Sequence, residues 1–494
     1  MYNTFRAEDE KLLCIFLLNG FCAECLKPLL SIHQHFIGKR CHTSFKKEEI
    51  KNPMFTRKQL VNLILPLAGE QLLAVTIGLS DTMMVANVGE AAVSGTSIID
   101  AINVLLIQIF SALATGGAVV AAQYIGRGDK ESGCTAAKQL LYAITFLAAM
   151  VMALCLAFRT QIIYLVYGDL DAEVMKNAQI YFFFTSLSYP FLAIYNAGAA
   201  LFRAMGNSKI SMMVSLIDNV VHIGTNAVLI FVCGFGAMGA GIGTLFARIL
   251  AAIAMLILIC RPVNTIYVDH PFRFCFLPDM VFRILHIGVP NGLENGMFQI
   301  GKLIVQRVVT TFGTSAIAAN AVAGSISSVA NIPGNACSLA LITIVGQCLG
   351  AGDYDQAQYY TKRLMRTAYI SMGTVNIMLL IASKAVVGVY SLDPVASATA
   401  IQILQLFAFC SATIWIPSFF LPNALRAAGD VRFTMLTSTI SMWVFRIGFC
   451  FILTQVFHLG VQGVWGAMYI DWSVRMIVFT IRYRSGKWKT KKVI

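Results

Sequence analysis

The stretch QYIGRGD at residues 123–129 returns as QCLGAGD at residues 347–353, so that every residue number is higher by 224. A constant offset that extends over about sixty positions indicates a duplicated unit. The chain is 57% hydrophobic and has a mean hydropathy of +0.73. So long a repeat therefore predicts half of a membrane protein rather than a small solenoid unit. Three earlier pairs share the offset: Pro66 and Pro290, Glu70 and Glu294, and Gly89 and Gly313.

The 494 residues include only 12% charged residues, and a bilayer span needs about 20 apolar residues. The resulting prediction is an all-α integral membrane protein with twelve transmembrane helices in two six-helix lobes. Because six is even, the lobes enter the membrane in the same orientation, related by a pseudo-twofold axis along the membrane normal. The expected spans are 60–86, 91–120, 136–158, 177–203, 209–233, 239–260, 283–311, 316–346, 364–391, 397–425, 431–456 and 462–482.

The formal charge of +13 resides in short segments between the apolar runs, a pattern typical of membrane orientation rather than of nucleic-acid binding. Basic residues such as Arg127, Lys130 and Arg432 follow even-numbered helices, whereas Asp169 and Asp393 lie in the opposite gaps. The positive-inside rule then predicts a multi-pass plasma-membrane protein with both termini in the cytoplasm.

Five segments are expected along the chain. The extension 1–53 has an acidic cluster before a short apolar run, so it is neither a good signal peptide nor a span, and Met54 is a candidate translation start. An N-lobe (54–260) is followed by a Pro-containing linker (261–279) as a candidate hinge, a C-lobe (280–485) and a basic tail (486–494). The 13 cysteines imply no disulfide framework, and Cys22-x-x-Cys25 fits no standard zinc spacing. No metal is expected.

Ionisable residues inside spans are the first candidates for function, because a charge at the bilayer centre costs about 3 kcal/mol. Glu70 and its repeat mate Glu294 fall near mid-membrane. Asp81 is about three helical turns beyond Glu70 and faces the same side. Asp100 lies on the second span, and Asp218 is one turn before His222 on the fifth.

The second lobe carries fewer acids, since Val305 and Gly324 stand at the positions that match Asp81 and Asp100. The N-lobe is therefore the better candidate for cation or proton coupling. The alternative is that the acids form structural ion pairs with Lys302, Arg307, Arg248 or Arg446, and a buried pair alone is weak evidence of stabilisation.

Proline and glycine motifs carry less specific information. Pro190, Pro417 and Pro422 are expected to kink the fourth and tenth spans, which suits either alternating access or a static bend. The two Gly-x-Gly-Asp turns follow hydrophobic helices and lack a Walker pattern, so they predict helix C-caps and tight turns rather than phosphate loops.

Over residues 54–485 the chain resembles the multidrug and toxic compound extrusion (MATE) transporters. The resemblance is carried by Ser80-Asp81-Thr82, Val88-Gly89-Glu90, Gln123-Tyr124-Ile125-Gly126 with its copy at Gln347, and Arg203-Ala204-Met205-Gly206. It implies a two-lobe exporter of organic cations and amphipathic compounds that exchanges them for Na⁺ or H⁺ by alternating access, with no cofactor and no enzymatic activity.

The resemblance also assigns residues to the family's N-lobe cation site. Its first-span acid falls on Asp81 and its sixth-span threonine on Thr244, whereas His222 and Asn226 stand where an Asn and an Asp four apart are usual. Since one carboxylate is thereby lost, we expect Asp81, Asp218 and His222 to form the coupling cluster. The residues expected to line the substrate cavity are Glu70, Asp100, Glu294 and Lys302.

Other functional classes are less well supported. A flippase for lipid-linked precursors, from the same superfamily, would need bases in its cavity to hold pyrophosphate. A membrane-embedded enzyme would need clustered catalytic groups, and no such motif is present. A channel fits a mid-membrane repeat interface less well than a transporter does. We expect a monomer that contacts lipid and binds small molecules, and the sequence leaves open the substrate and the choice between Na⁺ and H⁺.

Overall fold

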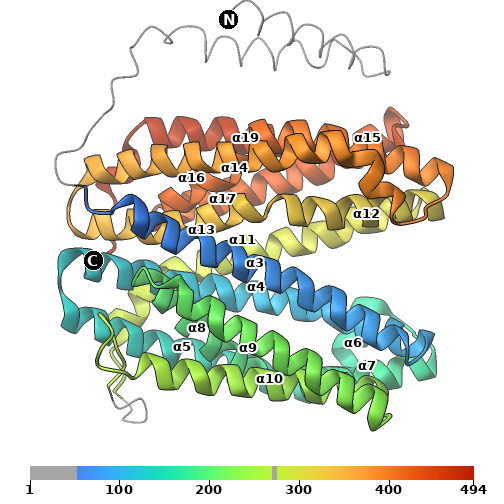
Figure 1. Cartoon of the computed structure of the whole chain (residues 1–494), viewed down its shortest axis with the longest axis horizontal. Coiled ribbons are helices and arrows are strands. Elements are labelled where there is room, and N and C mark those ends of the chain that lie inside the picture. The colour runs from blue at the N-terminus through green and yellow to red at the C-terminus, as the bar shows by residue number, and fades with distance from the viewer. Residues whose placement is uncertain (1–52, 270–274) are drawn as a thin grey trace, which may run out of the picture. The chain divides into compact units, whose positions relative to one another are not determined.

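The predicted spans are all present as helices in the computed structural model, which describes residues 53–269 and 275–494 (Figure 1). The extension before Pro53, with its candidate cysteine motif, lies outside the described residues. The first half contains α3 (Arg57–Ala86), α4 (Glu90–Arg127), α5 (Lys130–Ala157), α6 (Arg159–Tyr167), α7 (Ala172–Leu187), α8 (Tyr189–Ala204), α9 (Ser208–Ala227) with its π-helical end η1 (Val228–Val232), and α10 (Gly236–Ile259).

The second half repeats this order at residues 278–484. It contains α11 (Pro278–Thr310), α12 (Thr314–Ala330), α13 (Ile332–Gly350), α14 (Tyr354–Gly388), α15 (Pro394–Cys410), η2 (Ser411–Trp415), α16 (Ile416–Ala427), α17 (Val431–Ile440), η3 (Ser441–Gly448), α18 (Phe449–Phe451), η4 (Ile452–Val456) and α19 (Gly460–Arg484). We call α3–α10 the N-lobe and α11–α19 the C-lobe.

Several predicted spans are interrupted. The fourth breaks at Ser188 into α7 and α8, directly before Pro190, and the eighth breaks at Asn331, directly before Pro333 within α13. The tenth contains the π-helical segment η2 before Pro417. Proline lacks an amide hydrogen and its ring clashes with the preceding turn, so it sits at a new helix start. The break near Pro333 and the short helix α6 are differences from the predicted boundaries.

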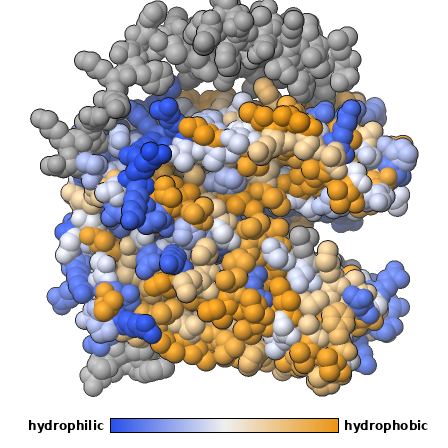
Figure 2. Space-filling model, in the orientation of Figure 1, coloured by the Kyte–Doolittle hydropathy of each residue, from blue (hydrophilic) through white to orange (hydrophobic). Residues whose placement is uncertain are grey.

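Nine helical segments among the described residues are long and apolar enough to cross a membrane. The other three spans, α7–α8, α11 and α19, are broken or carry ionisable residues inside them. Apolar side chains on the outer faces remain exposed, such as Leu165 at 85% and Ile381 at 80%. Figure 2 shows these apolar surfaces between two more hydrophilic ends of the molecule, which is the distribution expected of a bilayer-spanning protein.

The first helix of each lobe crosses to the other lobe. In the half of α3 that begins at Arg57, Leu60 and Leu63 pack into the apolar core of the C-lobe. Their repeat mates Ile284 and Ile287 of α11 pack into the core of the N-lobe. Figure 1 shows α3 passing obliquely between the two sets of helices. The predicted lobe limits of 54–260 and 280–485 therefore leave out a reciprocal exchange of these two half-helices.

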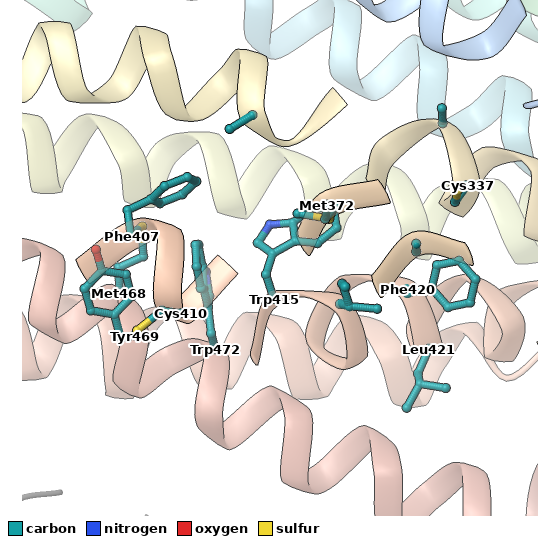
Figure 3. Close-up of a cluster of buried hydrophobic side chains, with 14 of the residues drawn as sticks. Cys337, Met372, Phe407, Cys410, Trp415, Phe420, Leu421, Met468, Tyr469 and Trp472 are labelled. Atoms are coloured by element: carbon teal, nitrogen blue, oxygen red, sulfur yellow. The ribbon is translucent and has the colours of Figure 1, made fainter. Parts of the chain in front are cut away.

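Aromatic and sulfur-containing side chains fill the core of the C-lobe (Figure 3). The Trp415 ring stacks on Phe419 at 5.1 Å between centroids, and Phe407 meets Trp472 edge-to-face at 6.2 Å. A Cβ at Gly334 of α13 would collide with Met372 and Trp415. Glycine at this position thus lets α13 approach the aromatic core closely.

The two ends of the helix bundle differ, and we name them by their loops. The linker end carries residues 261–269 and 275–277 and the turns Gly128–Asp129 and Gly352–Asp353. The far end carries the loops around Asp169 and Asp393. Ile266 and Val268 of the linker are buried. The backbone amide of Leu277, at the end of the linker, donates a hydrogen bond to Gln139 Oε1 of α5. The described part of the predicted hinge is therefore packed against the N-lobe, and α11 begins at Pro278, within the predicted linker.

Candidate functional site

Asp81 of α3 lies at the centre of a polar cluster inside the N-lobe. Its Oδ1 accepts a hydrogen bond from Asn226 Nδ2 at 3.1 Å and lies 3.5 Å from His222 Nδ1. His222 Nε2 lies 2.9 Å from the Thr244 hydroxyl, and that hydroxyl donates to the backbone carbonyl of Ala240. The structure thus brings together four of the five predicted coupling residues from α3, α9 and α10. All but Asp81 are buried.

Helical periodicity explains this arrangement. His222 and Asn226 are one turn apart on α9, so their side chains share one face. Gly243 of α10 allows that face to approach, because a Cβ there would collide with the Asn226 side chain. Asn226 Oδ1 and His222 Nδ1 are buried and have no hydrogen-bond partner among the described residues. Such atoms are rare in proteins, and the Asn226 oxygen is a free acceptor beside a carboxylate.

Asp100 of α4 faces Asp81 across a small cavity. Its Oδ1 accepts from the Tyr181 hydroxyl at 3.0 Å and from Asn103 Nδ2 at 3.3 Å. Asp81, Asp100, Tyr181 and Asn226 all line the cavity, whose volume is about 10 Å³. That is close to the smallest space that holds one water molecule. Asp100, predicted as a substrate-cavity residue, therefore lies next to the predicted coupling residues.

Asp218 does not join this cluster through any hydrogen bond within the described chain. Its Oδ1 is buried without a partner, one turn before His222 on α9. Arg248 of α10, a candidate partner for the acids, donates instead to the Ser188 hydroxyl at 2.6 Å. Of the five predicted coupling residues, Asp81, His222, Asn226 and Thr244 are therefore linked by successive contacts at bonding distance, and Asp218 lies apart from these bonds.

Glu70 and Glu294 occupy a different environment from the one expected. Glu70 pairs with Arg203 of α8 at 2.9 Å and accepts from the Ser211 hydroxyl at 2.7 Å. Glu294 pairs with Arg426 of α16 at 2.6 Å. These side chains are at most 14% exposed. A role for both acids in lining the substrate cavity stays a prediction; in this structure each carboxylate is held by a neighbouring guanidinium.

The two ion pairs are copies of one another, since Arg203 and Arg426 are separated by nearly the same offset as the two acids. Both arginines lie in the last turns of their helices, α8 and α16, and their guanidinium groups point back into the lobes toward the glutamates. The nearly constant offset shared by an acid and a base is compatible with both pairs, but it does not single out Arg203 and Arg426 from the other bases of the chain.

The repeated glutamines connect the lobes at the linker end. Gln123 Nε2 of α4 donates to the Ala427 carbonyl of α16 at 2.8 Å. Gln347 Nε2 of α13 donates to the Ala204 carbonyl of α8 at 2.7 Å. Each glutamine thereby reaches the residue that directly follows a paired arginine. Two reciprocal hydrogen bonds, buried on both sides, close this end of the interface between lobes.

Two glycines allow that closure. A Cβ at Gly126 would collide with the backbone carbonyl of Gln347, and a Cβ at Gly350 would collide with that of Gln123. The backbones of α4 and α13 therefore touch here, as small residues permit in membrane helices. At the far end, Figure 2 shows the surface hollowed between the lobes. We call the reciprocal contact of Gln123, Gly126, Gln347 and Gly350 the glutamine gate.

Lys302, the remaining predicted cavity residue, lies in the C-lobe and is exposed. Its ammonium group lies 5.4 Å from the centre of the Phe298 ring, one turn earlier on α11. It is not near Asp81 or Asp100, and it makes no ion pair within the described residues. Lys302 therefore belongs to a second polar region, distinct from the N-lobe cluster.

The remaining predictions concern prolines and metals. Pro190 and Pro417 start helices after an interruption, and Pro422 lies inside α16, close to Arg426. A conformational role for them stays a prediction. Across residues 53–269 and 275–494 no group of three or more His, Cys, Asp or Glu side chains could hold a metal ion.

Comparison with known proteins supports this architecture. The MatE family model matches residues 66–228 and 290–452, two segments of equal length that start at the repeat mates Pro66 and Pro290. The "Probable multidrug resistance protein NorM" of Thermotoga maritima is 24% identical over 91% of this chain and 96% of its own length. The "Uncharacterized transporter YisQ" of Bacillus subtilis is 24% identical over 90% and 98%.

A solved structure described as the outward-facing conformation of a multidrug resistance MATE family transporter has the same fold. It superposes with a TM-score of 0.81 at 18% identity, over 88% of this chain and 97% of that one. The matched family segments cover more than half of the chain and contain both halves of the duplication. The chain therefore belongs to the MatE family, and it is a multi-pass membrane transporter rather than an enzyme.

Proposed function

We propose that this transporter exports small amphipathic molecules, organic cations among them, in exchange for Na⁺ or H⁺. The observation that carries the proposal is the contact of Asp81 with Asn226 and His222 beside a cavity inside the N-lobe. An ionisable group within a membrane span is costly and is typical of ion pathways and proton relays. The names of the multidrug resistance relatives support the substrate class.

The Asp81 cluster can bind a cation chemically. A carboxylate oxygen, the unpartnered Asn226 Oδ1 and the Thr244 hydroxyl supply oxygen ligands, which hard cations prefer. The same carboxylate can take up a proton instead. Asp100 across the cavity adds a second negative charge, and two acids at short range favour neutralisation of one of them. Arrival of a coupling ion would therefore change the local charge by one unit.

We infer that the glutamine gate closes the transporter toward the cytoplasm. The basic loops belong to the linker end, so the positive-inside rule orients this end and both termini inward. The two Gln-to-carbonyl bonds and the close approach of α4 and α13 hold the lobes together there. Alternating access would require these contacts to open when the lobes rock about the interface.

A flippase for lipid-linked precursors remains the second candidate. It would place bases on both walls of the cavity to hold pyrophosphate. Basic residues gather in the C-lobe alone, around Phe298, and the symmetric region of the N-lobe contains acids. This asymmetry favours the exporter.

The decisive experiment uses the full chain in proteoliposomes loaded with rhodamine 6G, a fluorescent organic cation. Dye movement is measured with an imposed proton gradient, with an imposed sodium gradient and with neither. We expect one gradient to drive transport and the variant Asp81→Asn to abolish that acceleration. Asp169→Asn, the same change in a far-end loop, is the matched control and should transport normally.

Two outcomes would overturn the proposal. Transport that is equally fast with and without either gradient would indicate a facilitator rather than an antiporter. Gradient-driven transport that survives in Asp81→Asn at the rate of Asp169→Asn would show that the coupling ion binds elsewhere.

A further inference from the structure

We propose that the C-lobe holds a binding site for an oxyanion, formed by Lys302 and Arg446 beside Phe298, which takes the carboxylate of amphipathic, zwitterionic substrates. The inference rests on the proposed export function for its physiological meaning. The site itself is argued from charge and geometry. The N-lobe acids alone would favour cationic substrates. The C-lobe site adds a preference for substrates that also carry an anionic group.

Three cations converge on one aromatic ring. Lys302 Nζ lies 5.4 Å from the centre of the Phe298 ring, and the guanidinium carbons of Arg446 and Arg475 each lie 5.5 Å from it. These residues come from α11, η3 and α19, so the tertiary fold and not local sequence assembles them. Because Lys302 and Arg446 contact the same ring, one small ligand can reach both of their charged groups.

The acids present do not balance these charges. Asp471 is fully buried, and its Oδ1 accepts from Arg475 Nε at 2.8 Å and from the Ser441 hydroxyl. Arg475 also donates to the Ser438 carbonyl of α17, so these groups are committed to holding α19 against α17 and η3. One carboxylate against three cations leaves two positive charges uncompensated in this region of the lobe.

Arg446 and Lys302 carry the unbalanced charge. Arg446 Nη1 lies 4.0 Å from the second Asp471 oxygen, and its Nε is buried without a partner. The Arg446 side chain is only 11% exposed. Lys302 forms no ion pair with any residue that the structure describes, and it is exposed although Val305, three residues later on α11, is buried. Its ammonium group is therefore open to a ligand.

A buried guanidinium with a free donor and an accessible ammonium form a suitable receptor for an oxyanion. Charged hydrogen bonds from such groups to carboxylates are the strong ones, and uncompensated charge in a low-dielectric region gains most from a partner. The Phe298 ring offers an apolar surface next to the charges. A carboxylate, a sulfonate or a phosphate shares the required chemistry, and a carboxylate is the form that the experiment below uses.

The duplication places this site opposite the acidic cluster. Arg446 is the repeat mate of His222, at the same offset at which Val305 replaces Asp81. The N-lobe position thus has a neutral or weakly basic imidazole beside an acid, and its C-lobe mate has a permanent cation. A molecule that reached both regions would meet negative charge in the N-lobe and positive charge in the C-lobe, as a zwitterion requires.

Two dyes that differ in one group test the proposal. Rhodamine 6G is an ethyl ester and a cation, whereas rhodamine 19 is its free carboxylic acid and a zwitterion. Binding of each to the purified full chain in nanodiscs is measured by fluorescence anisotropy. We expect Lys302→Gln to weaken rhodamine 19 about tenfold, the scale of a lost charged hydrogen bond, and to change rhodamine 6G less than about twofold.

Matched variants separate a binding role from a structural one. Lys384→Gln removes the same charge from an exposed position of α14 and should leave both dyes unchanged. Lys302→Arg should keep the preference for rhodamine 19. Arg446→Gln leaves Asp471 with one cation fewer and can impair folding, so Arg446→Lys is the informative change there and should retain most of the affinity.

The proposal is overturned if wild-type protein fails to bind rhodamine 19, or if Lys302→Gln weakens both dyes equally or neither. Failure of the export proposal looks different. Gradient-independent dye transport with an intact effect of Lys302→Gln on rhodamine 19 binding would remove the antiport mechanism and leave the oxyanion site in place. Loss of dye selectivity together with intact gradient-driven export of rhodamine 6G would remove the oxyanion site and leave the antiport mechanism in place.

Discussion

The two lobes share one set of contacts and differ in the charge of the polar regions inside them. Each retains a glutamate paired with an arginine, a glutamine that reaches across the interface, and a glycine at the point of closest approach. The polar regions inside the lobes differ in sign. The N-lobe gathers Asp81, Asp100 and Asp218 near one arginine, whereas the C-lobe gathers three cations near one acid.

We infer that the shared contacts belong to conformational change and the differing regions to binding. A gate made by two lobes works only if both surfaces fit, so its residues occur in pairs at one offset. A binding site inside one lobe contacts no counterpart and can diverge after duplication. Symmetric residues are therefore expected to affect conformational change, and asymmetric residues to affect ion and substrate selection.

The largest effect is expected when the N-lobe is given the charge of the C-lobe. His222→Arg reproduces Arg446 at its symmetric position and places a permanent cation within reach of Asp81, now 3.5 Å from the imidazole. The guanidinium would occupy the carboxylate in place of a coupling ion. We expect gradient-driven export in proteoliposomes to fall about 100-fold.

His222→Gln is the control for that change, because it is neutral and can still bond Thr244. It should retain at least a tenth of the wild-type export rate, a loss of about 1.4 kcal/mol or less. Equal losses in both variants would show that packing around the imidazole, not its charge, matters at this position.

The next largest effect concerns the paired glutamates. Glu70→Gln and Glu294→Gln each leave a largely buried arginine without its counter-charge, at a cost of about 3 kcal/mol. Because the pairs are repeat mates, we expect both variants to lower the midpoint of thermal unfolding by similar amounts, measured by the fluorescence of the unfolding protein in detergent.

A second substitution distinguishes an ion pair from a simple packing effect. Glu70→Gln combined with Arg203→Met removes both charges and should recover most of the lost stability. A double variant less stable than Glu70→Gln by itself would contradict the pairing as the source of the effect.

The two-lobe fold and most of the Asp81 cluster could be predicted from the sequence. The constant offset between the two halves was visible directly, because duplicated glycines and prolines keep their spacing, and it led to the two-lobe fold. The grouping of Asp81, His222, Asn226 and Thr244 followed from family positions and the one-turn spacing on α9. Helical periodicity settles such neighbours within one element without tertiary knowledge.

The sequence could not indicate which base meets which acid. Glu70 and Arg203 lie on different helices, far apart along the chain, and four other bases were equally reasonable partners for the acids. The exchange of the first halves of α3 and α11 between lobes was also hidden, since Leu60 and Ile284 fit either core by hydrophobicity. Both features depend on tertiary packing, which local patterns do not encode.

A moderate effect is expected at the closest approach of the lobes. Gly126→Ala and Gly350→Ala each add a Cβ where a backbone carbonyl now lies, at a cost to the closed gate of about 2 kcal/mol. The added cost should shift the population toward the form that is open at the linker end. Distances between spin labels placed on α4 and α13 at that end would report the shift.

Gly224→Ala is the matched control, because this helical glycine of α9 has open space around it. It should leave the label distances unchanged. Unaltered distances in both gate variants would mean that α4 and α13 do not separate during the transport cycle.

The smallest effect is expected from the glutamine gate bonds themselves. Gln123→Ala and Gln347→Ala each remove one Nε2 hydrogen bond to a carbonyl, at 2.8 and 2.7 Å, with a cost of about 1 kcal/mol to the closed gate. Because the two bonds are symmetric and close the same end, each single change should raise the population open at the linker end by a similar factor, about fivefold. The double change tests whether the two bonds depend on each other. Independent bonds give additive free energies, whereas a loss of one bond that already removes the other gives a double variant hardly more open than either single one. Spin-label distances in the three variants distinguish these cases. If the free energies of opening in the two single variants differ by more than about 1 kcal/mol, the symmetry of the structure does not extend to the energetics of opening.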